Sequence, residues 1–84
     1  MAQFFQTFTA AGNSDTQTAA DGSFFANGTF NGATVNLQFT VDNGSTWHTI
    51  HSLSAAGIVR FDLGVGFQLR INVTGSPTSI TAGI

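Results

Sequence analysis

The chain lacks cysteine, lysine, glutamate and tyrosine, and it has a single proline and a single tryptophan. Without cysteine, neither a disulfide nor a cysteine-based metal site can stabilise a small domain. The 84 residues suffice for one domain, 1–84. A domain of this size buries only about 60% of the surface that its unfolded chain exposes. The nine phenylalanines therefore favour extra burial against neighbouring molecules.

Charge is nearly absent as well. The charged side chains are Asp15, Asp21, Asp42, Asp62, Arg60 and Arg70, and the net charge is −2. Two cations cannot neutralise a run of phosphates or hold a polybasic contact with lipid, so we expect neither nucleic acid nor membrane as a partner. No segment approaches the roughly 20 apolar residues of a membrane span, and no signal peptide is visible. Synthesis in a cytoplasm is the expectation.

Side chains that could perform enzymatic chemistry are scattered along the chain. The four aspartates fall on different predicted loops and strands, with no glutamate to complete a carboxylate pair. No serine stands in a GxSxG elbow. His48 and His51 are three residues apart on a predicted strand, so we expect them on opposite faces and not as a chelating pair. The sequence therefore predicts no enzyme, no metal and no cofactor.

The clearest structural signal is Asn31-Gly32, which stands between two segments of alternating hydrophobicity, 24–30 and 33–41. Such a pair favours a two-residue hairpin turn, because both central residues need a positive φ. Pairing the two segments across this turn puts one set of residues on a single face, namely Phe24, Ala26, Gly28 and Phe30 opposite Phe39, Leu37, Val35 and Ala33. We therefore expect a hairpin here, with Phe25 on its polar face.

Further short strands are expected along the rest of the chain. They lie at 3–9, 17–20, 46–52, 58–63, 67–73 and 78–84, with a loop at 10–16 and a turn or bulge at Asp21-Gly22. Gly64-Val65-Gly66 is predicted to close a hairpin that places Arg60 opposite Arg70. Trp47 and Ile50 have opposite parity, which a β-bulge would reconcile. The sequence thus predicts an all-β fold, a small antiparallel β-sandwich or jelly-roll-like barrel of about seven short strands, with 1–16 as an N-terminal arm and loop.

The segment from Thr40 to Trp47 reads TVDNGSTW. It resembles the Asp-box hairpin of sialidases and several other β proteins, Ser/Thr-x-Asp-x-Gly-x-Thr-Trp. The resemblance implies that Asp42 caps the turn, that Gly44 supplies an unusual dihedral and that Trp47 packs inward. The box occurs once, whereas a propeller would need several blades. It therefore indicates a structural turn and no catalytic site.

Two groups of side chains are candidates for contact with a partner. Arg60, Asp62 and Arg70 form the one predicted charged cluster, either a surface ion pair or an anchor between subunits. The second group is aromatic and consists of Phe4, Phe5 and Phe8 in the N-terminal arm, together with Phe25. Phe25 is expected either under a loop or second sheet, or exposed to a partner.

The order of these features is similar to small all-β virion proteins of tailed bacteriophages. The features are an aromatic N-terminal strand, the hairpin GTFNGATVNLQFTVDNGSTW, then GIVRFDL and FQLRINVTG, and a short last strand. The chain most resembles capsid decoration (cement) or head-fibre proteins. The resemblance implies synthesis in the bacterial host and many copies on the capsid exterior. It also implies contact with the major capsid protein, and a homo-oligomer, often a trimer.

Three other functions are alternatives. A carbohydrate-binding module would use Trp47 or Phe25 as a stacking platform, with Asn36, Gln38 and His48 around it. A tail, fibre or baseplate module of a phage would share the same composition and strand pattern. An adhesion domain cut from a larger protein is a third alternative, against which the Met1 start argues.

Overall fold

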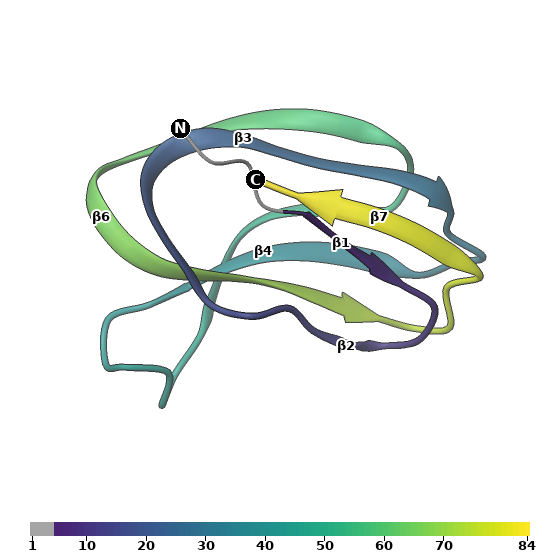
Figure 1. Cartoon of the computed structure of the whole chain (residues 1–84), viewed down its shortest axis with the longest axis horizontal. Helices are drawn as coiled ribbons and strands as arrows, with labels where there is room; N and C mark the ends of the chain where they lie inside the picture. The colour runs from purple at the N-terminus through teal and green to yellow at the C-terminus, as the bar shows by residue number, and fades with distance from the viewer. Residues whose placement is uncertain (1–4) are drawn as a thin grey trace.

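The computed structural model describes residues 5–84, which form seven β-strands and no helix (Figure 1). The strands are β1 (Phe5–Phe8), β2 (Gly12–Asn13), β3 (Gln17–Thr29), β4 (Thr34–Thr40), β5 (His48–Leu53), β6 (Gly57–Thr74) and β7 (Ser79–Gly83). They make one antiparallel hydrogen-bonded sheet in the order β1-β7-β3-β6-β4-β5, and β2 also pairs with β6. The predicted all-β fold is confirmed.

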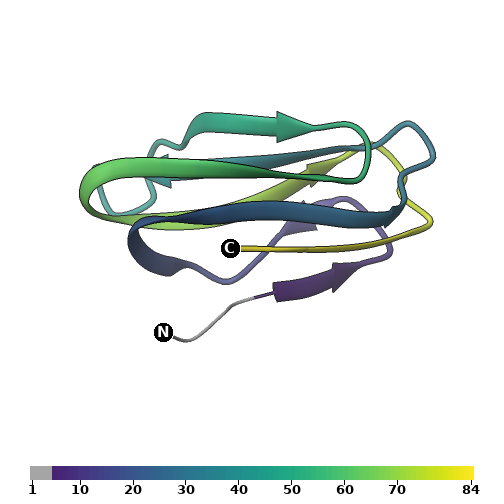
Figure 2. The ribbon, with the colours of Figure 1, turned by 90° about the horizontal axis from the view of Figure 1, so that it is seen from above.

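The long strands β3 and β6 fold this sheet into two layers. Both strands turn back at the same end of the molecule, on the left of Figure 1. Figure 2 looks onto the layer in which β6, β3, β7 and β1 follow one another from top to bottom. The other layer contains β5, β4, the second half of β6, and β2. The result is a small sandwich whose layers share two strands.

The bend in β6 corrects one sequence prediction. Residues 57–74 form one continuous strand, so Gly64-Val65-Gly66 does not close a hairpin. Ala19 pairs with Phe67 and Asp21 with Asp62, which leaves four residues of β6 opposite Ala20 alone. The glycines therefore form a wide bulge that lets both strands cross from one layer to the other. The turn or bulge predicted at Asp21-Gly22 is misplaced: both residues are paired with β6, the register shifts one residue earlier, at Ala20, and the extra residues lie on β6.

The predicted 24–41 hairpin is half right. Asn31 and Gly32 have φ values of 51° and 81°, and Ala33 N–H donates to Phe30 O at 2.9 Å, so the turn forms. The flanking strands do not pair with each other, because β3 pairs with β6 and β7 while β4 pairs with β5 and β6. The turn carries the chain from one layer to the other.

The core lies between the two layers. Its fully buried side chains include Phe24 and Ile80 from one layer and Leu37, Leu69 and Ile71 from the other. Most residues predicted for the inner face of the hairpin are buried here, although they face each other across the core and not along a ladder. The alternation therefore predicted the correct faces with the wrong partners.

A bulge forms at Ile50, as predicted, but it does not turn both residues inward: Ile50 packs against the core, whereas Trp47 contacts Arg70, so the expected inward packing of Trp47 is wrong. In the pairing of β4 with β5, the register shifts so that Leu37 pairs with His51 and Gln38 with Thr49. Ile50 is the extra residue, and it packs against the core. The same bulge places His51 and His48 opposite Leu37 and Phe39, which share a face, so the prediction of opposite faces for the two histidines is wrong.

Candidate interaction surface

A row of apolar residues crosses the outer face of the layer that contains β1. Phe5 pairs with Gly83, Gly83 pairs with Phe25, and Phe25 pairs with Ile58, so the row spans four adjacent strands. Phe5 is 61% exposed and Ile58 is 69% exposed, while Phe25 is half-buried. We call Phe5, Gly83, Phe25 and Ile58 the apolar row.

Simple strand geometry creates this row. Successive side chains of a strand point to opposite faces, so Phe24 enters the core and Phe25 points outward. Gly83 has no side chain, yet it is buried, as expected when large residues on the neighbouring strands lean over a glycine. Ile58 was not among the predicted contact residues. Ile58 and the buried Phe61 have opposite parity on the same strand, so alternation alone could have identified Ile58 as an outward-facing residue.

The aromatic residues predicted in the arm separate in the structure. Phe5 lies on the apolar row, whereas Phe8 is 5% exposed and packs in the core. Phe8 therefore has almost no surface to present to a partner. Phe4 lies outside the described residues. Next to the row, the Thr7 and Thr81 hydroxyls form a hydrogen bond of 3.1 Å that links β1 to β7.

The predicted charged cluster does not assemble. Arg60 pairs with Ser23 and Asp62 with Asp21, on the outer face beside the apolar row. Arg70 pairs with Gln38 in the other layer, so Arg60 does not face Arg70. The Asp62 carboxylate accepts a hydrogen bond from Gly64 N–H at 3.0 Å and so braces the bulge of β6. The correction follows from β6 being one strand, because the two arginines then lie on its opposite halves.

The outer face of the second layer is polar and internally hydrogen-bonded. Ser52 Oγ donates to Asn36 Oδ1 at 2.7 Å, Asn36 Nδ2 to Asn72 Oδ1 at 3.1 Å, and Asn72 Nδ2 to Asn13 Oδ1 at 2.7 Å. These residues are direct register partners on β5, β4, β6 and β2. Cross-strand pairs of this kind contribute about 0.2–1 kcal/mol each. The face is therefore a polar surface braced by its own hydrogen bonds.

A second chain of contacts runs beside this one and includes Trp47. Arg70 Nε donates to Gln38 Oε1 at 2.8 Å, and Gln38 Nε2 donates to Thr49 Oγ1 at 3.2 Å. The Arg70 guanidinium lies 4.4 Å from the centre of the Trp47 ring, a cation–π contact. Burial of the guanidinium lowers the pKa of Arg70. Because Arg70 occupies one face of the indole, that face is closed to a stacking sugar.

The remaining residues of the sugar-binding alternative lie apart. His48 stacks on Phe39, with ring centres 5.3 Å apart. Phe39 faces away from Asn36 and Gln38 on β4, because its neighbours of the same parity point into the core. His48 therefore does not join Trp47 and the amides on one platform. Within residues 5–84, no group of three or more His, Asp or Glu side chains could hold a metal ion.

The turn from Thr40 to Trp47 is built by two side chains. Thr40 Oγ1 donates to Asp42 Oδ1 at 2.7 Å and accepts from Gly44 N–H at 2.9 Å. Asp42 Oδ1 also accepts from Thr46 N–H at 2.9 Å. Gly44 has a φ of 94°, which favours glycine. Two hydrogen bonds hold the pKa of Asp42 below its usual value of 3.8. The larger effect comes from the Thr40 hydroxyl and the smaller from the Thr46 backbone amide.

This lowered pKa predicts an acid-sensitive turn. A carboxylate whose pKa is lower in the folded state stabilises that state above its unfolded pKa, and loses this contribution as the pH falls through the folded value. We therefore expect the Asp42 contribution to be complete above about pH 3.8 and to disappear below it. Urea unfolding across this range should show a weaker pH dependence for Asp42→Asn. Asp15→Asn, outside the turn, is the control, and an equal change in both variants would contradict the assignment.

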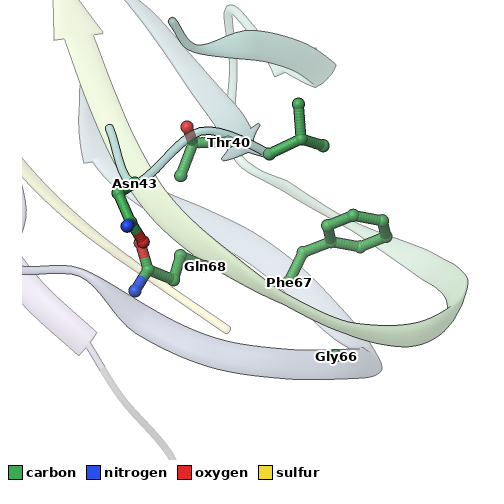
Figure 3. Close-up of a pocket in the computed structure, with 6 residues that line it drawn as sticks. Thr40, Asn43, Gly66, Phe67 and Gln68 are labelled. Atoms are coloured by element: carbon green, nitrogen blue, oxygen red, sulfur yellow. The ribbon is translucent and has the colours of Figure 1, made fainter. Parts of the chain in front are cut away.

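A shallow groove lies between this turn and the bulge of β6 (Figure 3). Its volume is about 260 Å³, and it is lined by Thr40, Val41, Asn43, Gly66, Phe67 and Gln68. No lining side chain titrates near neutral pH, so the groove has no group for acid–base chemistry. It can accept a small apolar or amide group of a partner.

The described residues contain no helix that could cross a bilayer. Two surface features distinguish this molecule: an exposed apolar row on one outer face, and a polar face braced by hydrogen bonds on the other. No known protein family, curated protein or solved structure matches the chain.

Proposed function

We propose that this chain is a non-enzymatic structural protein of a tailed-phage virion, a capsid decoration protein bound in many copies to the head exterior. Three features support the proposal: the resemblance of its strand pattern to such proteins, its small all-β sandwich, and its nearly uncharged surface. The partners are the major capsid protein and further copies of this chain. A tail, fibre or baseplate position of the same virion would use the same surface.

The apolar row is the observation that carries this proposal. Phe5 and Ile58 expose most of their surface at the two ends of one line across four strands, and Phe25 lies between them. Scattered single apolar residues are common on protein surfaces, but contiguous patches mark contacts with other molecules. Exposed apolar side chains on a sheet face suit contact with another protein surface.

Assembly also adds stability to a small domain that has no disulfide and buries little surface of its own. A partner that binds only the folded chain stabilises it by mass action. A surface with six charged side chains has little electrostatic repulsion to overcome when copies pack side by side. A repetitive lattice presents its sites at high local density, so rapid electrostatic steering is not needed.

Replacing Phe5 by alanine and Ile58 by serine together should abolish association while the domain stays folded, because both side chains are mostly exposed. Light scattering at micromolar concentration would measure the oligomer, and co-sedimentation with virion particles would measure binding. Val65→Ser is the matched control, because Val65 is 62% exposed but lies outside the apolar row. A wild-type chain that is monomeric and does not sediment with particles would contradict the proposal.

A further inference from the structure

The chain contains three Asn-Gly pairs, at 27–28, 31–32 and 43–44. In such a pair the glycine nitrogen can lose its proton and attack the asparagine Cγ. A new C–N bond then closes a succinimide ring, and the Cγ–Nδ2 bond breaks with release of ammonia. Water opens the ring to aspartate or isoaspartate, so the reaction needs no other reactant. Glycine favours it because it has no side chain to hinder ring closure.

The fold treats these three pairs differently. Asn27 and Gly28 lie within β3 and pair with Thr81 and Ile80 of β7. Closing the ring there requires this part of the ladder to open, because the attacking nitrogen belongs to a backbone that is paired with β7. Asn27 is thus protected by the sheet.

The pair at Asn43 is protected in another way. The Gly44 N–H donates a hydrogen bond of 2.9 Å to the Thr40 hydroxyl, and this hydroxyl is itself fixed on Asp42. The attacking nitrogen of Gly44 is therefore engaged as a donor. This bond must break before the nitrogen can turn toward the Asn43 side chain.

Asn31 lacks both kinds of protection. It lies with Gly32 in the exposed turn between β3 and β4, outside any strand. The bond that closes this turn is donated by Ala33 N–H to Phe30 O, so it does not engage the Gly32 nitrogen. The hydrogen bond that holds Asn31 involves its side-chain amide, whose Nδ2 donates to Ser76 O at 3.1 Å.

We propose that Asn31 is a site of spontaneous deamidation, and that it converts ahead of Asn43 and Asn27 in the folded protein. Conversion changes the molecule in two ways. It adds a negative charge to a chain with a net charge of −2. It also replaces the donor that holds Ser76 with a carboxylate, which repels the Ser76 carbonyl oxygen, so the turn separates from the loop between β6 and β7.

Incubation of the folded protein in mildly alkaline buffer, followed by chymotrypsin and mass spectrometry, tests this order. Chymotrypsin cleaves after aromatic residues, and Phe25, Phe30, Phe39 and Trp47 separate the three pairs into different peptides. Asn31 should convert first, and Asn43 about fivefold more slowly, the factor expected for breaking one hydrogen bond of typical strength. Water labelled with heavy oxygen would identify the hydrolysed positions.

Two comparisons separate the effect of the fold from that of local sequence. In concentrated urea all three pairs should convert at similar rates, because every protecting contact is lost. Thr40→Val removes the acceptor of Gly44 N–H, so Asn43 should then convert nearly as fast as Asn31. Folded wild-type protein in which Asn43 or Asn27 converts first, or in which all three convert together, would overturn the proposal.

Discussion

Replacement of Phe24 by alanine is expected to unfold the protein at room temperature. Phe24 is the largest of the fully buried side chains, with 0% of its surface exposed. Truncation of a buried phenylalanine typically costs about 3–5 kcal/mol. A small domain without disulfides is expected near the low end of the usual range of stability, about 5 kcal/mol. The cavity left by the ring therefore removes most or all of the free energy of unfolding.

Phe25→Ala is the matched control for this experiment. It deletes the same ring one residue later in β3, from the half-buried outer face and not from the core. We expect Phe25→Ala to remain folded, with a small loss of stability and a weaker association. Circular dichroism during urea unfolding measures both variants. Equal destabilisation by the two substitutions would contradict the assignment of inner and outer faces.

These faces could be predicted from sequence, because alternation depends only on strand geometry. Phe24, Ala26, Val35 and Leu37 were all placed on one face, and all four are buried. What alternation does not specify is the neighbouring strand. A segment with one apolar face can lie beside its sequence neighbour or opposite it across a core, and both arrangements bury the same residues. The Asn31-Gly32 turn is compatible with either.

Alternation also bears on whether residues 57–74 form one strand or two. Phe61, Leu69 and Ile71 are all buried and have the same parity in sequence. That phase is unbroken across 64–66, as in one continuous strand. A hairpin with a three-residue loop would also place Phe61, Leu69 and Ile71 on one face. Parity alone therefore does not distinguish a hairpin from one continuous strand. The structure resolves the ambiguity because β3 pairs with both halves of β6.

The candidate surface was only partly predictable for a related reason. Phe5 and Phe25 could be identified as apolar residues off the core face. Their alignment with Gly83 and Ile58 depends on the registers of β1, β7, β3 and β6. These registers join residues that are far apart in sequence, and no local pattern encodes them. A single aromatic residue becomes part of a surface only through this long-range pairing.

Gly28→Ala is the second substitution with a large expected effect, and it tests the order of the strands. Gly28 pairs with Ile80 of β7 and has a φ of 133°. A Cβ at this position would overlap the carbonyl oxygen of Ser79 and lie 3.0 Å from Ile80 Cα. Both obstacles are backbone atoms, which cannot rotate away. We expect a loss of about 3 kcal/mol or more, from a strained dihedral together with overpacking.

Gly32→Ala separates these two contributions. Gly32 also has a positive φ, 81°, but a Cβ there would meet nothing within 4 Å. Its substitution should therefore cost only the backbone strain, about 1–2 kcal/mol. The difference between the variants in urea unfolding reports how closely β7 approaches Gly28. Had β3 paired with β4, Gly28 would face Val35 and Ser79 would lie elsewhere. A Gly28→Ala variant no less stable than Gly32→Ala would thus contradict the pairing of β3 with β7, and with it the alignment of the apolar row.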